Sequence, residues 1–241
     1  RTCGIERLPD RQAIAKAIAV AMREQLQREE EARATDTPQP LTRSDATNYR
    51  PSCPPPPATL PGRLDSSQTR AQQGYFQDVR CLQYHDFKWG GYYLEIGVDD
   101  GVENNNTVLL DEQFGWCGCC VDPNANRMAS RTCAFFPVAL ASRTGTAQFS
   151  WGGPYSGLTE FVSSETHNAM HCDMAEHMWT STVEVRTPLE VLESAHAPTE
   201  IDYLSLDVEG SEMEILRAFP FDKYRIAFAT IETNNDAAKE V

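Results

Sequence analysis

The amino-acid sequence predicts an α/β fold with a doubly wound, mostly parallel sheet. Short apolar segments rich in β-branched and aromatic residues alternate with segments of helical character, as they do in strand–helix–strand units. Several apolar segments end in an acidic residue or a glycine, which is typical of the carboxyl ends of parallel strands. The five strands expected in this way are 92–96, a segment ending at 121, 134–138, 201–206 and 226–231.

The stretch Tyr92–Gly101, YYLEIGVDDG, is the centre of this pattern. Its first five residues contain four strand-forming apolar side chains, as expected of a strand buried on both faces. Gly97 and Gly101 follow where the chain must turn toward a helix. A strand–glycine turn–helix unit presents backbone N–H groups to a ligand at the carboxyl end of the sheet.

The connections are predicted from capping and apolar spacing. Thr187-Pro188-Leu189-Glu190 is a helix start, with a Thr cap, Pro at the first helical position and Glu190 completing a capping box. The stretch 151–182 shows no periodicity and is expected to be an irregular lid or substrate loop. Other helices are expected at 68–87, 104–114, 124–131 and 211–219, and a hairpin arm at 145–150.

Three regions are expected: an N-terminal amphipathic helix within 1–34, a Pro-rich linker at 35–65, and the α/β domain at 66–241. Ile14, Ile18, Met22 and Leu26 recur every four residues from Asp10 onward and form one narrow apolar stripe. This stripe either lies on a protein partner or packs back on the domain. The linker holds eight of the fifteen prolines and is expected to be an extended spacer.

The ends of the sequence lead to two expectations. The first residue is Arg1, so a targeting segment has been removed or the sequence begins inside a longer product. The sequence stops at Val241, about ten residues after the fifth strand, too soon for a C-terminal hairpin. The apolar strand 226–231 is then an open edge, which we expect a partner subunit or further chain to cover.

Composition excludes several classes of function. With 35 acidic against 21 basic residues, the net charge of −14 argues against binding nucleic acid or anionic membranes. No apolar run reaches membrane-spanning length, so a soluble protein is expected. The eight cysteines are interpreted as buried thiols of a reducing intracellular compartment, the cytoplasm or an organelle interior.

No metal site is predicted. The CGCC stretch at 117–120 matches no standard zinc-ligand spacing. His167, His171, Cys172 and His177 include an i,i+4 histidine pair that could share a zinc ion, but they complete no structural zinc pattern.

The predicted carboxyl edge of the sheet is acidic and contains no Lys or Arg. A pyrophosphate would meet carboxylates without a compensating cation, so a dinucleotide is a poor fit. A cofactor with ribose hydroxyls and a cationic sulfonium fits better, and Asp122, which ends the second strand, is placed to accept both ribose hydroxyls. The edge residues are Glu95, Gly97, Asp99, Gly101, Asp122, Ala139, Asp207, Glu209 and Glu232.

Four segments together resemble the FkbM family of methyltransferases: GGYYLEIGVDDGVENNNT with GWCGCCVDPN, FPVALASRTGTAQF, IDYLSLDVEGSEMEILRAF and IAFATIETN. The likeness covers roughly 68–234, and the DVEG-x-E block at 207–212 is its most specific part. It implies a Rossmann-like class I methyltransferase fold that uses S-adenosylmethionine and typically methylates hydroxyl oxygens. The family usually has Ala and an amide where this chain has Val98 and Asp99.

The resemblance also assigns binding residues. Glu95, Gly97 and Gly101 would hold the methionine end of the cofactor. The Asn106-Thr107 pair would lie at the first helix, Asp122 would bind the ribose and Ala139 would lie on the adenine side.

Asp207 and Glu209 are the candidate catalytic residues, because a hydroxyl acceptor benefits from a base. Alternatively, Asp207 only orders the cofactor's amino group and Glu209 only places charge at a helix N-terminus. Two functions therefore remain: an O-methyltransferase acting on a small molecule, glycan or protein, and a non-catalytic accessory subunit that docks through its N-terminal helix.

Overall fold

The computed structural model describes residues 53–71, 75–124, 131–152, 155–162 and 179–232. The chain divides into two compact units, 1–48 and 49–241, and every described residue belongs to the second. The predicted N-terminal helix, most of the predicted helix 124–131 and the four His and Cys residues between 167 and 177 lie outside the described residues. Among the helices of the described part, none combines the length and apolarity needed to cross a membrane.

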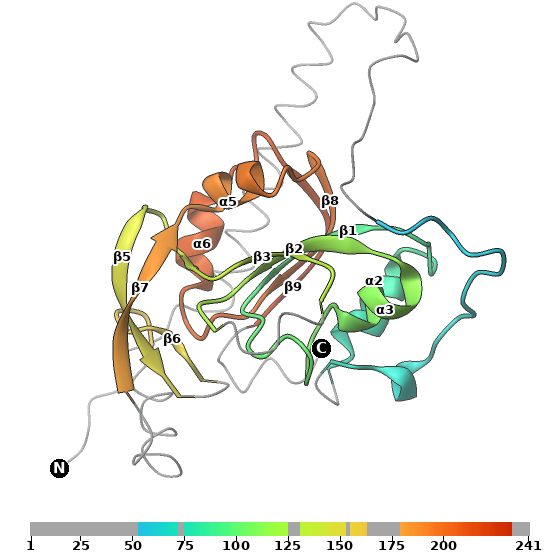
Figure 1. Ribbon diagram of the computed structural model, residues 1–241, viewed down its shortest axis with the longest axis horizontal. Helices are drawn as coiled ribbons and strands as arrows, with labels where there is room; N and C mark the ends of the chain where they lie inside the picture. The colour runs from blue at the N-terminus through green and yellow to red at the C-terminus, as the bar shows by residue number, and fades with distance from the viewer. Residues whose placement is uncertain (1–52, 72–74, 125–130, 153–154, 163–178, 233–241) are drawn as a thin grey trace, which may run out of the picture. The chain divides into compact units, whose positions relative to one another are not determined.

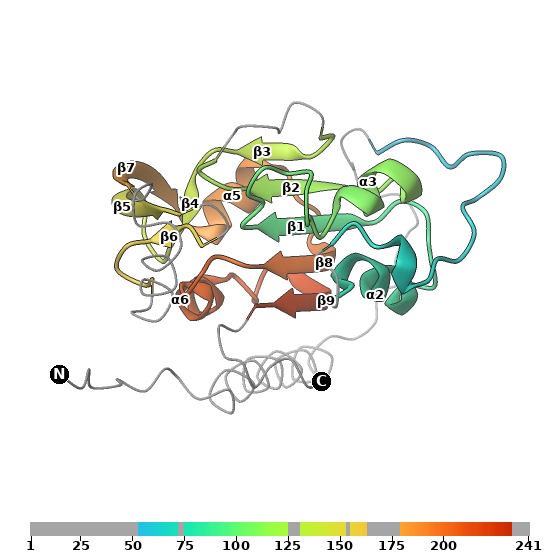
Figure 2. The same ribbon diagram turned by 90° about the horizontal axis from the view of Figure 1, so that it is seen from below.

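A five-stranded sheet forms the centre of the domain, in the order β3-β2-β1-β8-β9 (Figure 2). All four of its strand pairs are parallel. The predicted α/β fold with a parallel sheet is therefore confirmed. The strands are β1 (Tyr92–Ile96), β2 (Cys117–Val121), β3 (Ala134–Phe136), β8 (Glu200–Leu206) and β9 (Arg225–Ile231).

Alternate side chains of each strand point to opposite faces of this sheet. Helices cover both faces. Leu94 and Ile96 pack in one core cluster with α5 (Pro188–Ser194) and α6 (Glu212–Ala218). Tyr93 packs in a second cluster with α2 (Gln77–Tyr84) and α3 (Val108–Phe114). Figure 1 shows the two pairs of helices on either side of the strands.

The second sheet corrects the prediction that 151–182 is irregular. It contains β4 (Ala139–Leu140), β5 (Gly145–Trp151), β6 (Gly157–Leu158) and β7 (Trp179–Arg186), in the order β4-β7-β5-β6. β7 pairs antiparallel with the whole length of β5. Its sequence, WTSTVEVR, is rich in β-branched residues, and pairing with the predicted hairpin arm makes it a strand.

Two predicted helices are too long. The first covers only α2, because Phe76 has a positive φ of 54° and no helix continues through that conformation; a separate 3₁₀ turn, η1, spans Ser66–Gln68. The second begins at Val108, not at Asn104, whose φ is 51°. The third strand ends at Phe136, two residues early. The helix predicted from the Thr187 capping box is confirmed, and both bonds of the box are present.

The interpretation of the cysteines as buried thiols is wrong for four of them. Disulfides join Cys53 to Cys117 and Cys120 to Cys133, while Cys81 and Cys119 are free. Each bridge ties a residue of β2 to a segment that only the folded chain brings beside it, so spacing alone does not show the pairs. Because disulfides persist in oxidising compartments, the expectation of a reducing compartment loses its basis.

Gly118 provides a test of the β1–β2 packing. A Cβ at this position would lie 2.4 Å from the Tyr93 carbonyl oxygen and 2.5 Å from its ring, and both belong to the paired strand β1. Overpacking of this kind destabilises proteins by about 1–3 kcal/mol. We expect Gly118→Ala to lower the free energy of unfolding, measured in urea, by at least this amount. Gly62→Ala, with no atom within 4 Å, is the control; equal midpoints for the two variants would contradict the described packing.

Candidate functional site

The carboxyl ends of the strands meet at one edge of the central sheet. The ladder of parallel hydrogen bonds continues one residue past each strand. Gly97 N donates to Val121 O at 3.0 Å, and Asp207 N to Ile96 O at 3.0 Å. Glu232 N likewise donates to Leu206 O at 2.9 Å. The residues that follow β1, β8 and β9 are thereby held side by side, as the sequence predicts.

The turn after β1 depends on Gly97. Its φ is +83°, and a Cβ would lie 1.5 Å from the Asp207 carbonyl oxygen. The backbones that follow β1 and β8 are therefore in direct contact, and only glycine fits between them. Gly101 also has a positive φ, +79°, and closes the turn by donating its N–H to Val98 O at 2.9 Å.

Asp122 holds this turn from the neighbouring strand. One oxygen, Oδ2, accepts hydrogen bonds from Val98 N at 2.8 Å and Asp99 N at 2.9 Å. The other oxygen accepts from Asn124 N at 2.7 Å. Burial raises the pKa of Asp122 from 3.8 to about 6, although these three bonds favour the carboxylate. Asp122 thus lies beside the glycine turn, and its contact with a ribose stays a prediction.

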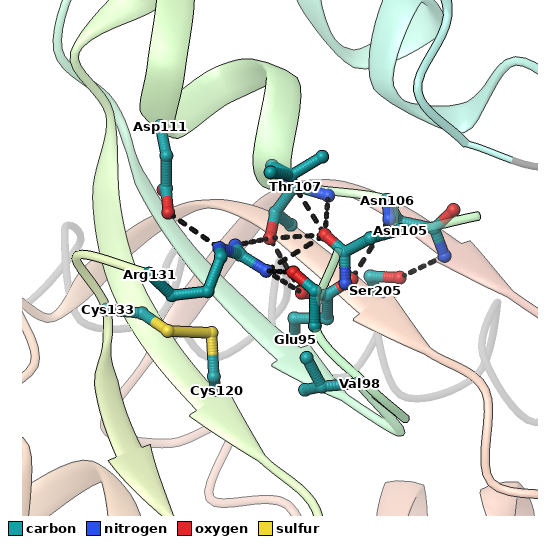
Figure 3. A network of polar contacts seen from close by, with 12 residues as sticks. Glu95, Val98, Asn105, Asn106, Thr107, Asp111, Cys120, Arg131, Cys133 and Ser205 are labelled. Carbon is teal, nitrogen blue, oxygen red and sulfur yellow. Dashed lines mark hydrogen bonds and ion pairs between the residues drawn. A yellow bond between two sulfur atoms is a disulfide. The ribbon is translucent and has the colours of Figure 1, made fainter. Parts of the chain in front are cut away.

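Glu95 points away from solvent, toward the start of α3 (Figure 3). Its side chain is 1% exposed. Thr107 Oγ1 donates to its Oε2 at 2.6 Å, and Asn106 N donates to its Oε1 at 3.1 Å. Two residues assigned by the resemblance, Glu95 and Thr107, are therefore bonded to each other. The geometry makes them supports of the turn and helix start, and direct cofactor contact by either one stays a prediction.

Asn106 differs from its neighbour Thr107. Its Nδ2 donates to Ser205 Oγ at 2.9 Å, whereas its Oδ1 is buried with no hydrogen-bond partner among the described residues. A buried acceptor without a donor costs free energy, so such an atom indicates a missing partner. The oxygen is available for a donor group of a ligand.

Sequence reasoning missed Arg131, whose side chain is 2% exposed and forms the hub of the network in Figure 3. Its guanidinium donates to Asp111 Oδ2 at 2.9 Å and Thr107 Oγ1 at 2.6 Å, and it lies 3.7 Å from Glu95 Oε2. It also donates to Gly101 O at 2.8 Å and Asn105 Oδ1 at 3.0 Å. Arg131 ends no strand, but it brings a buried cation to the acidic residues of this edge.

The charge of Arg131 is already neutralised by its partners. Burial alone would lower its pKa, but Glu95, Tyr93 and Asp111 together raise it, so Arg131 stays cationic. Burial also raises the pKa of Glu95, and Arg131 and the hydrogen bonds counteract this. An arginine so engaged is not a receptor for a phosphate. No pattern around position 131 signals its role, because the contacts come from segments distant in sequence.

Three carboxylates gather after β8 and β9. One oxygen each of Asp207, Glu209 and Glu232 lies within 4.8 Å of the others. Burial raises the pKa of Asp207 well above its usual value, and a hydrogen bond with Glu232 and the charge of Glu232 add to the shift. The structure thus brings both predicted catalytic residues together. Oxygen ligands at this spacing could also hold a divalent cation, whereas the sequence predicts no metal.

The loop that carries Asp207 and Glu209 is shaped by Glu212, which sequence reasoning did not single out. Glu212 Oε1 accepts from Val208 N at 3.1 Å, and Oε2 accepts from Gly210 N at 3.0 Å. Gly210 has a φ of +123°, and a Cβ there would lie 2.4 Å from Phe161 O. This gives the DVEG-x-E block a physical basis: the last Glu fixes the backbone that presents the first two acids.

Ala139 is placed differently from the other predicted residues. It begins β4 of the second sheet and packs with Phe149 and Leu158, with 7% of its surface exposed. It does not end β3, as the sequence suggested. Asp99, by contrast, stays at the turn, where its Oδ1 accepts from Asn124 Nδ2 at 3.1 Å.

Comparison with known proteins identifies one family. The Methyltransferase FkbM domain matches residues 95–240, which is more than half of the chain and includes the glycine turn and all three clustered carboxylates. No curated protein and no solved structure matches the chain.

The pKa of Asp122 predicts a dependence of stability on pH. Because the folded-state pKa of about 6 lies above the ordinary 3.8, the folded protein binds this proton more tightly. The contribution to stability is complete below about pH 4 and is lost as the pH rises through 6. The difference between a pKa of 3.8 and one of about 6 corresponds to about 3 kcal/mol.

We therefore expect Asp122→Asn to remove about this much of the fall in unfolding free energy between pH 4 and pH 7, measured in urea. Asp222→Asn, at an exposed site, is the control. Parallel stability–pH curves for wild type and Asp122→Asn would show that Asp122 does not titrate as described.

Proposed function

Since the chain belongs to the FkbM methyltransferase family, we propose that it transfers a methyl group from S-adenosylmethionine to a hydroxyl oxygen of a small molecule, glycan or protein. The observation that carries this proposal is the meeting of the Gly97 turn with the Asp207, Glu209 and Glu232 carboxylates at one sheet edge. This edge offers backbone and acidic groups, which suit a cationic sulfonium and ribose hydroxyls better than a phosphate.

The residues of the turn fit such a cofactor. Gly97 leaves no room for a side chain, so the backbone can approach a ligand closely. The buried Asn106 Oδ1 lacks a donor, and the ammonium of the methionine end would supply one. Asp122 would hold the ribose with the lone pairs that its backbone bonds leave free. When bound, S-adenosylmethionine would supply an electrophilic methyl group on sulfur.

The protein's own chemistry would be positioning and removal of a proton. Methyl transfer is an in-line displacement, for which alignment of the acceptor matters most. Asp207 and Glu209 are proposed to take the hydroxyl proton. A carboxyl whose pKa is raised by burial is a stronger base near neutral pH than an exposed one, and Asp207 meets this condition.

A second function is an accessory subunit that keeps the fold without the chemistry. One observation favours it: Asp122 already accepts three backbone hydrogen bonds, which a purely structural residue would also do. In this case, residues 10–34 and the edge of β9 would bind a protein partner. Within the described residues β9 pairs on one side only, with β8.

Titration of the protein with S-adenosylhomocysteine in a calorimeter separates the two functions. We expect the wild type to bind and Gly97→Ala to lose binding by at least about tenfold, because the added Cβ forces the β1 and β8 turns apart. Gly62→Ala, at a site with open space, should bind as the wild type does. Absence of heat with the folded wild type would favour the accessory subunit.

Catalysis is tested by release of S-adenosylhomocysteine in the presence of hydroxyl acceptors drawn from sugars, small alcohols and Ser-containing peptides. We expect Asp207→Asn to keep cofactor affinity and to lower turnover by about 10²–10⁴-fold, the usual contribution of a base. Asp222→Asn should keep full turnover. Full turnover in both Asp207→Asn and Glu209→Gln would remove base catalysis from the proposal.

A further inference from the structure

We propose that the Cys120–Cys133 disulfide is a redox-sensitive element that positions Arg131, and that its reduction by a dithiol weakens cofactor binding. Arg131 is in this view a positioning residue, which acts through Glu95 and the turn and does not touch the cofactor. The binding part rests on the proposed function, whereas the positioning part concerns the protein alone.

The disulfide ties the segment that carries Arg131 to the strand beside Glu95. Cys133 lies two residues after Arg131, and Cys120 pairs with Glu95 in the parallel β1–β2 ladder. The bridge therefore limits how far the Arg131 guanidinium can move from the Glu95 carboxylate. Figure 3 shows the bridge and the guanidinium on the same side of Glu95.

Arg131 in turn joins the two ends of the segment between β1 and α3. It donates to Gly101 O, at the end of the glycine turn, and to Thr107 Oγ1, at the start of the helix. It also donates to Asn105 Oδ1, which accepts from Val108 N at 2.8 Å. The residue with the unpartnered oxygen, Asn106, lies within this span. Displacement of Arg131 would leave two buried carboxylates, Glu95 and Asp111, without their cation.

The two cysteines differ in exposure, and this difference favours attack of a reductant at Cys133. Cys120 is fully buried, while Cys133 is half-buried. A thiolate of an external dithiol would attack Cys133 Sγ, the S–S bond would break, and Cys120 would leave as a thiolate and take up a proton. The second thiol of the reductant would then attack the mixed disulfide. The products are two cysteine thiols and the oxidised dithiol.

The chain provides a matched control. Cys53–Cys117 attaches to the same strand, β2, but at its first residue, which pairs with Tyr92 at the start of β1. It therefore crosslinks the end of the strand away from the glycine turn. Reduction or removal of this bridge should not move Arg131.

The first experiment compares Cys120→Ala/Cys133→Ala with Cys53→Ala/Cys117→Ala. We expect the former to weaken binding of S-adenosylhomocysteine by at least about tenfold and the latter to leave it unchanged. Hydrogen exchange at the amides of Asn106, Thr107 and Val108 should become faster only in the former. A Cys53→Ala/Cys117→Ala protein treated with dithiothreitol should show the same two changes and recover on reoxidation.

The second experiment tests whether the disulfide acts through Arg131. Arg131→Ala should show the same weakening and faster exchange, and adding Cys120→Ala/Cys133→Ala to it should have no further effect. Millimolar guanidinium chloride should partly restore affinity in Arg131→Ala, at matched ionic strength with sodium chloride, which a general loss of structure would not allow.

The experiments distinguish failure of the proposed function from failure of the inference about the disulfide and Arg131. If the folded wild type does not bind S-adenosylhomocysteine, the proposed function fails, and hydrogen exchange still decides the positioning of Arg131. Unchanged exchange at residues 106–108 after loss of the Cys120–Cys133 bridge would overturn the inference. Additive effects of the bridge and Arg131 would also overturn it.

Discussion

The carboxyl edge of the central sheet depends on one interaction, the pairing of a buried arginine with two carboxylates. Removing three charged groups from water is costly, and the cost is offset only when every lone pair and N–H has a partner. Arg131 meets this condition with Glu95, Asp111 and the neutral acceptors around them. The network fixes the chain from the glycine turn to the start of α3. The position of the glycine turn therefore depends on these ion pairs as well as on the hydrogen bonds of the sheet.

Buried carboxylates also hold the backbone of the loops along the carboxyl edge of the sheet. Asp122 holds the backbone of residues 98 and 99, Glu95 accepts from Asn106 N, and Glu212 accepts from Val208 N and Gly210 N. Each of these carboxylates satisfies N–H groups of a loop that has no ladder to join. Burial raises the pKa of all three, and the backbone bonds oppose that shift. Part of the acidic character of this edge is thus structural.

Local patterns carried much of the sequence prediction, and long-range contacts limited it. The strands β1, β2, β8 and β9 and the capping box of α5 follow from residues adjacent in sequence, and the structure has them where they were expected. β7 was missed because its strand character depends on pairing with β5, about thirty residues earlier. Arg131 and both disulfides were missed for the same reason. The residues at the carboxyl edge could be predicted from the topology of the sheet. The direction in which Glu95 points could not be predicted, because it depends on a partner in another loop.

Separating the carboxylates that anchor the backbone from the clustered carboxylates narrows the candidates for the catalytic base. Glu95, Asp122 and Glu212 accept from backbone N–H groups, and Asp99 accepts from Asn124 Nδ2. The remaining acidic residues predicted for this edge form the cluster of Asp207, Glu209 and Glu232. Asp207 and Glu232 share a hydrogen bond, which requires a proton on one of the two carboxyl groups. An acceptor hydroxyl near this group would meet a carboxylate and a carboxylic acid side by side. Such a pair can take the proton of the hydroxyl at one oxygen while it holds its own at another, so deprotonation adds no unpaired charge to a buried site.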